Sequence, residues 1–200
     1  MNPIRFPDRR TGLRAILILA LSLLLAGCGT MLGAVSSDEG IRQDPTDRTL
    51  GTMIDDETIE SLAAVNLRKA SPGLAESHIS VTSYNGLVLL AGQVRAETLR
   101  RQAEEVVLEL KNVRRVYNEL EVAGPTSLLT RSGDTWVTGK VKSRLLAAPE
   151  VPGRDIKVVT ENGVVHLLGL VTRDAADAAT EAARNVGGVR KVVRMFEYVD

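Results

Sequence analysis

Four side chains between residues 134 and 146 have the types and spacing needed to contact a phosphate-bearing membrane surface. Trp136, Lys140 and Arg144 recur every four positions, so on a helix they would share one face, while Lys142 would lie elsewhere on the polar surface. An indole suits a bilayer interface, and lysine and arginine stems can lie along apolar surface while their charges reach phosphates. These residue types and this spacing permit contact with an anionic phospholipid surface.

The same tryptophan, the only one in the chain, could instead be a core residue, because a large aromatic side chain gains much free energy from burial. The cations beside it would then form an ordinary solvated face. The segment in the equivalent place earlier in the chain carries Asp55, Asp56, Glu57 and Glu60, which anionic headgroups would repel. This asymmetry is compatible with lipid contact by the later segment alone, and it leaves the earlier segment as a spacer or a protein-contact module.

The only cysteine, Cys28, follows a segment with the charge order of a secretory signal. Arginines precede an apolar run from residue 15 to residue 25, and small residues lie immediately before the cysteine. This run is roughly half the length needed to span a bilayer, so the pattern does not predict a transmembrane helix. A lone cysteine also excludes a disulfide within one chain.

The sequence Leu25-Ala26-Gly27-Cys28 resembles the lipobox of bacterial lipoproteins. The resemblance implies a signal peptide over residues 1–27, cleavage before Cys28, and lipid attachment to that cysteine. Gly29 stands where lipoproteins kept at the inner membrane commonly carry Asp, so the resemblance implies an outer-membrane protein that faces the periplasm. A cleaved signal followed by an incidental thiol is the alternative.

Composition and residue spacing argue against several other classes of function. The chain has 25 basic and 25 acidic residues and 3% aromatic residues, which indicates neither a nucleic-acid-binding protein nor a sugar- or base-stacking platform. His78 and His166 have no second ligand at metal-binding spacing. We therefore predict a protein that is not an enzyme and that holds no metal or cofactor.

The elements that position these residues form an internal repeat. Residues 79–94 align without a gap to residues 156–171, and each copy places an Asn-Gly pair, Asn85-Gly86 or Asn162-Gly163, between two apolar runs. Such a pair is a strong signal for a two-residue β-hairpin turn. Apolar stripes at helical spacing lie before and after each hairpin, and a further strand pattern closes each copy.

The predicted fold class is therefore α+β, with two αββαβ domains whose three-stranded mixed sheets pack against two helices. Residues 54–122 form the first domain, residues 123–131 a linker and residues 132–199 the second domain. Residues 28–53 are polar and aperiodic, and we predict a flexible tether there. In the second domain, Asp134 is the predicted cap of the first helix, and Val137, Val141 and Leu145 are its core stripe. In the first domain, Leu62 is predicted on the buried stripe with Ile59, Ala63 and Leu67.

Each repeat resembles the BON domain, on its element order, its Asn-Gly hairpin and a glycine, Gly92 or Gly169, near the end of the second hairpin strand. Residues 134–146, 160–165 and 168–172 are similar to the second domain of outer-membrane lipoproteins with two BON domains. The resemblance implies binding of anionic phospholipid through the second domain, accumulation at division sites and support of outer-membrane integrity. Two alternatives remain: an adaptor that contacts outer-membrane assembly or division proteins, and a peptidoglycan or envelope-stress spacer.

Overall fold

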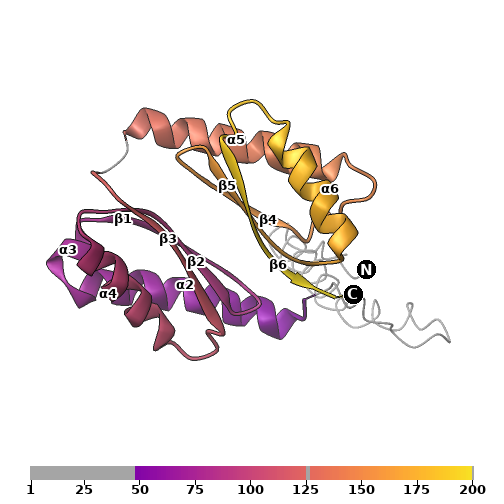
Figure 1. Ribbon diagram of the computed structural model, residues 1–200. Helices are drawn as coiled ribbons and strands as arrows, with labels where there is room; N and C mark the ends of the chain where they lie inside the picture. Colours follow the sequence, from indigo (N-terminus) through magenta and orange to yellow (C-terminus); the bar gives the residue numbers. More distant parts are fainter. Residues whose placement is uncertain (1–47, 125–126, 200) are drawn as a thin grey trace, which may run out of the picture. The chain divides into compact units, whose positions relative to one another are not determined.

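The computed structural model describes residues 48–124 and 127–199, which contain two domains with one shared order of elements. The first domain comprises α2 (Leu50–Ala70), α3 (Pro72–Ala75), β1 (His78–Tyr84), β2 (Leu87–Val94), α4 (Glu97–Leu108) and β3 (Arg115–Val122). The second comprises α5 (Leu128–Leu146), β4 (Lys157–Glu161), β5 (Val164–Val171), α6 (Arg173–Arg184) and β6 (Lys191–Tyr198) (Figure 1). The predicted αββαβ order is confirmed in both copies, and the short helix α3 is an addition that the sequence pattern does not predict.

Both long first helices begin earlier than predicted, because each has a side-chain cap further upstream. The Thr49 side chain accepts a hydrogen bond from the N–H of Thr52, and the Ser127 side chain accepts one from Thr130. Residues 50–53 of the predicted tether and residues 128–131 of the predicted linker are therefore helical. The prediction that Asp134 caps its helix is wrong, since this residue lies well inside α5.

Each sheet combines an antiparallel hairpin with a parallel third strand. β2 pairs antiparallel with β1 and parallel with β3, and β5 pairs in the same way with β4 and β6. The hairpin turns have positive φ at both residues, 53° and 74° at Asn85-Gly86 and 48° and 72° at Asn162-Gly163, as a type I′ turn requires. The parallel pairing follows because a helix links the hairpin to the last strand.

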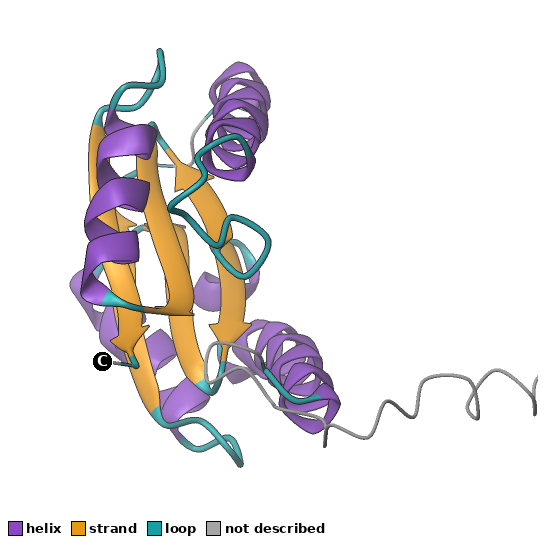
Figure 2. Ribbon diagram, turned by 90° about the vertical axis from the view of Figure 1, so that its right-hand side faces the viewer, coloured by secondary structure: helices purple, strands orange, loops and turns teal. Residues whose placement is uncertain are grey.

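The helices of each domain lie on one face of its sheet and close a separate core (Figure 2). In the second domain, Val137, Val141 and Leu145 of α5 meet Val165 and Leu167 of β5. The corresponding cluster of the first domain includes Ile59, Ala63 and Leu67 of α2 with Val88 and Leu90 of β2. Both cores consist wholly of residues after position 58, so a fragment from Gly29 onward retains both of them.

Leu62 does not belong to this core, contrary to prediction, and its exposed fraction is 47%. Asp56 is the reason, because its buried side chain binds the Asn85-Gly86 turn and so sets the rotation of α2. Leu62 then lies beside the core stripe rather than on it.

The opposite faces of the two sheets share a third apolar cluster within the compact unit that spans residues 44–200. Tyr84, Leu89 and Ala91 of the first domain pack with Leu168 and Met195 of the second. Polar contacts surround this cluster: Lys157 Nζ donates to Glu60 Oε1 at 2.6 Å, and Arg114 pairs with Glu197 at 2.7 Å. The two domains are therefore in direct contact.

The first described residue, Arg48, is bound to the first domain by two contacts. Its guanidinium donates to Asp56 Oδ2 at 2.9 Å and lies 3.9 Å from the centre of the Tyr84 ring. A cation above an aromatic face is attractive, and a buried carboxylate strengthens its hold. The chain is therefore attached to the first hairpin two residues before α2 begins.

Within the described ranges, none of the helices has the length and apolar character needed to cross a membrane.

Candidate lipid-contact site

The candidate site lies on α5, whose rotation is set by contacts on its inner side. Val137, Val141 and Leu145 are buried in the core. One turn earlier, the Asp134 side chain accepts hydrogen bonds from the N–H groups of Asn162 at 2.9 Å and Gly163 at 2.8 Å. These contacts hold the opposite side of α5 toward solvent.

Trp136 lies on that solvent side, with 70% of its surface exposed. It borders an apolar groove of about 630 Å³, whose lining also includes Gly139, Lys140, Ser143, Arg144 and Ala147 of α5 and Val186 beyond α6. Monomeric soluble proteins gain little from an exposed tryptophan beside an apolar groove, and such surfaces often contact membranes or partners. The core-residue alternative for Trp136 is therefore wrong.

Lys140 and Arg144 are the two cations of this groove, and they differ in how firmly they are held. The Lys140 ammonium donates a hydrogen bond to the carbonyl oxygen of Gly187, which anchors it near the Val186 wall. Arg144 has no hydrogen bond or ion pair with any of the residues described, so its guanidinium is available to a ligand. A guanidinium can bind phosphate oxygens through two N–H groups at once.

Lys142, the fourth predicted site residue, lies away from the groove. Its ammonium donates to the carbonyl oxygen of Ile156 at 2.6 Å. Burial lowers the pKa of Lys142 below its usual value, and the charge of Asp155 offsets only part of this shift. Lys142 therefore joins α5 to the segment before β4, and the structure brings together only Trp136, Lys140 and Arg144.

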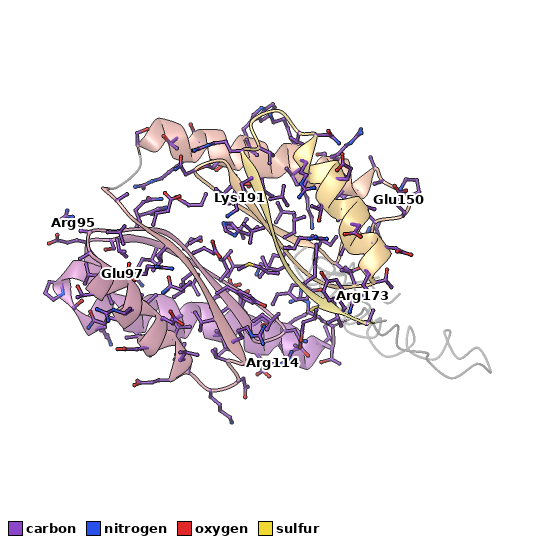
Figure 3. The ribbon with its side chains drawn as sticks, in the orientation of Figure 1. Arg95, Glu97, Arg114, Glu150, Arg173 and Lys191 are labelled. Atoms are coloured by element: carbon purple, nitrogen blue, oxygen red, sulfur yellow. The ribbon has the colours of Figure 1, made fainter. Side chains whose placement is uncertain are left out.

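A second, more polar hollow of about 400 Å³ adjoins the groove and shares Arg144 and Ala147 with it. Glu150, Glu181 and Asn185 contribute its polar groups. Glu150 follows the end of α5 (Figure 3), and Glu181 is held by Asn185, whose side-chain amide donates to the Glu181 carboxylate at 3.0 Å. Arg144 thus lies where an apolar hollow meets an acidic one.

The equivalent face of the first domain has different chemistry. If Asp56 is matched to Asp134, then Thr58, Leu62 and Asn66 occupy the places of Trp136, Lys140 and Arg144. The acidic surface predicted for this segment is only partly present, since Asp56 is buried and Glu60 contacts Lys157 and the Ser83 N–H. An aromatic residue with neighbouring cations is found on the second domain's first helix and not on that of the first domain.

The histidines lie outside this site. His166 of β5 is 2% exposed and faces the cluster shared by the two sheets, and its Nδ1 has no hydrogen-bond partner among the described residues. Burial, with a smaller contribution from the charge of Lys191 at the start of β6 (Figure 3), lowers the pKa of His166 to about 4. His78 Nε2 lies 3.9 Å from a carboxylate oxygen of Glu161.

No group of three His, Cys, Asp or Glu side chains poised to hold a metal ion is present among residues 48–124 and 127–199. Cys28, the predicted lipid attachment site, lies outside the described residues.

Sequence reasoning missed three further residues that line the groove, which are Gly139, Ala147 and Val186. Val186 lies 40 positions beyond the end of α5, and helical spacing alone carries no signal for such a contact. A sequence signal for the groove was present in the two glycines of α5, Gly133 and Gly139, since glycine is unfavourable within a helix and therefore suggests a special role.

Comparison with known proteins agrees with the repeat and the fold. The BON domain model matches residues 55–124 and 133–200. The outer membrane lipoprotein DolP of Haemophilus influenzae is 38% identical over 185 residues, which cover 92% of this chain and 95% of the relative. The 21 kDa hemolysin of Actinobacillus pleuropneumoniae is 40% identical and covers 81% of this chain and 84% of its own length.

The osmotically-inducible protein Y of Escherichia coli is 29% identical, with 96% of each chain aligned. The two repeats, the sheet topology and these similarities agree over nearly the whole described length. The chain therefore belongs to the BON-domain family, as a DolP-like member with two copies of the domain.

Proposed function

We propose that this chain is an outer-membrane lipoprotein, attached through Cys28 and facing the periplasm, whose second BON domain binds anionic phospholipid. The observation that carries the proposal is the exposed Trp136 beside Lys140 and Arg144 on one face of α5. The name of the H. influenzae relative supports the outer-membrane location. Support of outer-membrane integrity, at division sites, is the cellular role that we assign to this binding.

Electrostatics and the interfacial preference of the indole supply the affinity. Each cation near an anionic surface contributes about 1 kcal/mol, so Lys140 and Arg144 together give about 2 kcal/mol, or roughly thirtyfold in affinity. Lys142 is excluded from this sum, because it lies outside the groove that Lys140 and Arg144 line. Binding of this strength is weak for a free protein.

Attachment through a lipidated cysteine changes the consequence of weak binding. A tethered domain meets the membrane at a high effective concentration, so it needs only a modest lipid preference to choose its position. The anchor keeps the protein at the membrane, and α5 selects the lipids beneath it.

Tryptophan fluorescence of residues 29–200, titrated with vesicles, tests this proposal, since Trp136 is the sole indole. The fragment is needed because the lipid anchor would insert by itself. Vesicles that contain phosphatidylglycerol should shift the emission to the blue, and phosphatidylcholine vesicles should not. Arg144→Glu should weaken binding about thirtyfold, because it exchanges a positive for a negative charge.

Arg68→Glu is the matched control, since Arg68 is an exposed arginine in the last turn of α2 in the first domain. It should leave vesicle binding within about twofold of the wild type. Equal losses in both variants would mean that net charge, rather than α5, governs binding, and the proposal would be abandoned.

An adaptor for outer-membrane assembly or division proteins is the second candidate, and the exposed side of α2 favours it. Leu50 and Ile54 are 79% and 67% exposed, and Leu62 and Val65 continue this apolar side along the helix. Ile54→Asp should then abolish capture by purified assembly proteins, while Arg144→Glu leaves capture intact. The opposite pattern would assign partner binding to α5 as well.

A further inference from the structure

The groove beside α5 has the size and lining of a site for part of a lipid molecule, beyond what contact with a flat membrane surface requires. Its volume of about 630 Å³ falls within the range of small-molecule sites. Apart from its two cations and Ser143, the lining consists of Trp136, Gly139, Ala147 and Val186. Such a hollow favours an alkyl chain, because burial of apolar surface drives its binding.

We infer that this groove receives one acyl chain of an anionic phospholipid while the lipid phosphate is bound between Lys140 and Arg144. The inference rests on the proposed lipid binding and specifies its form: one lipid molecule occupies a site on the domain. Trp136 and Val186, which both line the groove, supply apolar surface for the chain. The charges of the phosphate and the two cations are complementary.

The acidic hollow fixes the direction in which the lipid lies. Glu150 and Glu181 line the hollow on the far side of Arg144, and their carboxylates repel a phosphate. The phosphate is therefore kept at Arg144 and Lys140, and the acyl chain extends toward Trp136. Hydroxyl groups of a headgroup can donate hydrogen bonds to the same carboxylates.

Gly139 makes this groove possible. Glycine within a helix costs stability, yet a Cβ added at Gly139 would meet no atom within 4 Å, so packing within the domain does not require a glycine. Its missing side chain instead leaves the groove open one turn from Trp136. Gly133, one turn on the other side of Trp136, has equally open surroundings but does not line the groove.

These two glycines provide a matched pair of variants. Gly139→Leu fills the groove and retains both cations, and Gly133→Leu adds the same apolar side chain to the same helix outside the groove. Each replaces a helical glycine with a better helix former, so both should unfold at or above the wild-type temperature. If Gly139→Leu fails to fold, Ser143→Leu fills the groove from the next turn of α5 and also retains both cations.

The probe is dihexanoyl phosphatidylglycerol, kept below its micelle concentration and titrated into residues 29–200. Trp136 fluorescence should show saturable binding of one lipid per chain to the wild type and to Gly133→Leu. Gly139→Leu should bind at least tenfold more weakly, although its added leucine increases the apolar surface of α5. Dihexanoyl phosphatidylcholine should bind at least tenfold more weakly than the anionic lipid.

Each other outcome has a distinct meaning. Equal binding by Gly139→Leu and Gly133→Leu would overturn the inference, because the acyl chain would then lie outside the groove. A wild type that binds anionic vesicles but no monomeric lipid would also overturn it, while the proposed function stands. A wild type that binds neither would overturn both.

Discussion

Asp56 and Asp134 do the same structural work in the two domains, since each accepts hydrogen bonds from both N–H groups of an Asn-Gly turn while lying within a helix. Asp56 also accepts hydrogen bonds from Ser83 Oγ at 2.7 Å and from Arg48. Each carboxylate joins the first helix of its domain to the tip of the hairpin. This contact decides which residues of α2 and α5 face outward.

Replacing either aspartate with alanine should destabilise the protein, and the loss should be larger at Asp56. Asp134→Ala leaves two N–H groups without an acceptor and should cost about 3 kcal/mol of unfolding free energy. Asp56→Ala removes the two equivalent hydrogen bonds of the first domain and also those from Ser83 and Arg48, so a greater loss of unfolding free energy is expected. Urea denaturation measures both values, and equal or negligible losses would contradict this assignment.

His166 should make stability depend on pH between about 6.5 and 4. Its pKa is lowered to about 4 in the folded protein, so the unfolded chain binds a proton at a higher pH than the folded one. Its stabilising contribution is fully present above pH 6.5 and is lost as the pH falls toward 4, by about 3 kcal/mol in total.

His166→Leu should flatten this part of the profile, because the equivalent residue of the first domain, Leu89, is already a buried leucine. Unfolding free energies from urea titrations at pH 4.5 and 7.5 measure the slope. An unchanged slope in the variant would show that other groups cause it.

Asp56 affects stability at lower pH than His166. Burial raises the pKa of Asp56, but hydrogen bonds from Gly86, Ser83, Asn85 and Arg48 together outweigh this effect, so its pKa lies below the usual value. The stabilising contribution of Asp56 is therefore present above about pH 4 and is lost as the pH falls below it.

Lys142→Met should affect stability more than lipid binding. The variant keeps the apolar stem but removes the donor to the Ile156 carbonyl, which should cost about 1 kcal/mol. Vesicle affinity should stay within about threefold of the wild type, in contrast to Arg144→Glu. Thermal unfolding and cosedimentation with phosphatidylglycerol vesicles measure the two effects. A loss of vesicle affinity as large as that of Arg144→Glu would contradict this prediction and would show that Lys142 contacts the lipid.

The Glu60–Lys157 pair should couple the two domains weakly. Its side chains are 24% and 38% exposed, so solvent screens the 2.6 Å contact, and a coupling energy of about 0.5 kcal/mol is expected. A double-mutant cycle with Glu60→Gln and Lys157→Met measures it, and the coupling should fall at high salt. A coupling energy that is large and independent of salt would indicate that water is excluded from the pair.

Local patterns in the sequence predict most of the fold. The two Asn-Gly pairs and the apolar stripes predict both hairpins and the four long helices, because these depend on neighbouring residues. Helical spacing likewise predicts the shared face of Trp136, Lys140 and Arg144. The exposure of Trp136 did not follow from spacing, since it depends on how the Asp134 contact rotates α5.

Long-range contacts explain what the sequence could not predict. Lys142 is of a residue type that usually lies on the surface, but its ammonium donates a hydrogen bond to the carbonyl oxygen of Ile156, 14 positions away. Val186 lines the groove together with residues of a helix that ends 40 positions before it. Neither partner can be identified from periodicity, because each depends on how α5 packs against the rest of the second domain.

The attachment of Arg48 determines how a mechanical load would enter the folded protein. A pull on the chain from its N-terminal side reaches the guanidinium contacts with Asp56 and Tyr84 before it reaches the first turn of α2. Asp56 passes the force to the tip of the first hairpin, and Tyr84 passes it to the cluster shared by both sheets. The two contacts of Arg48 would therefore share such a load with the first turn of α2.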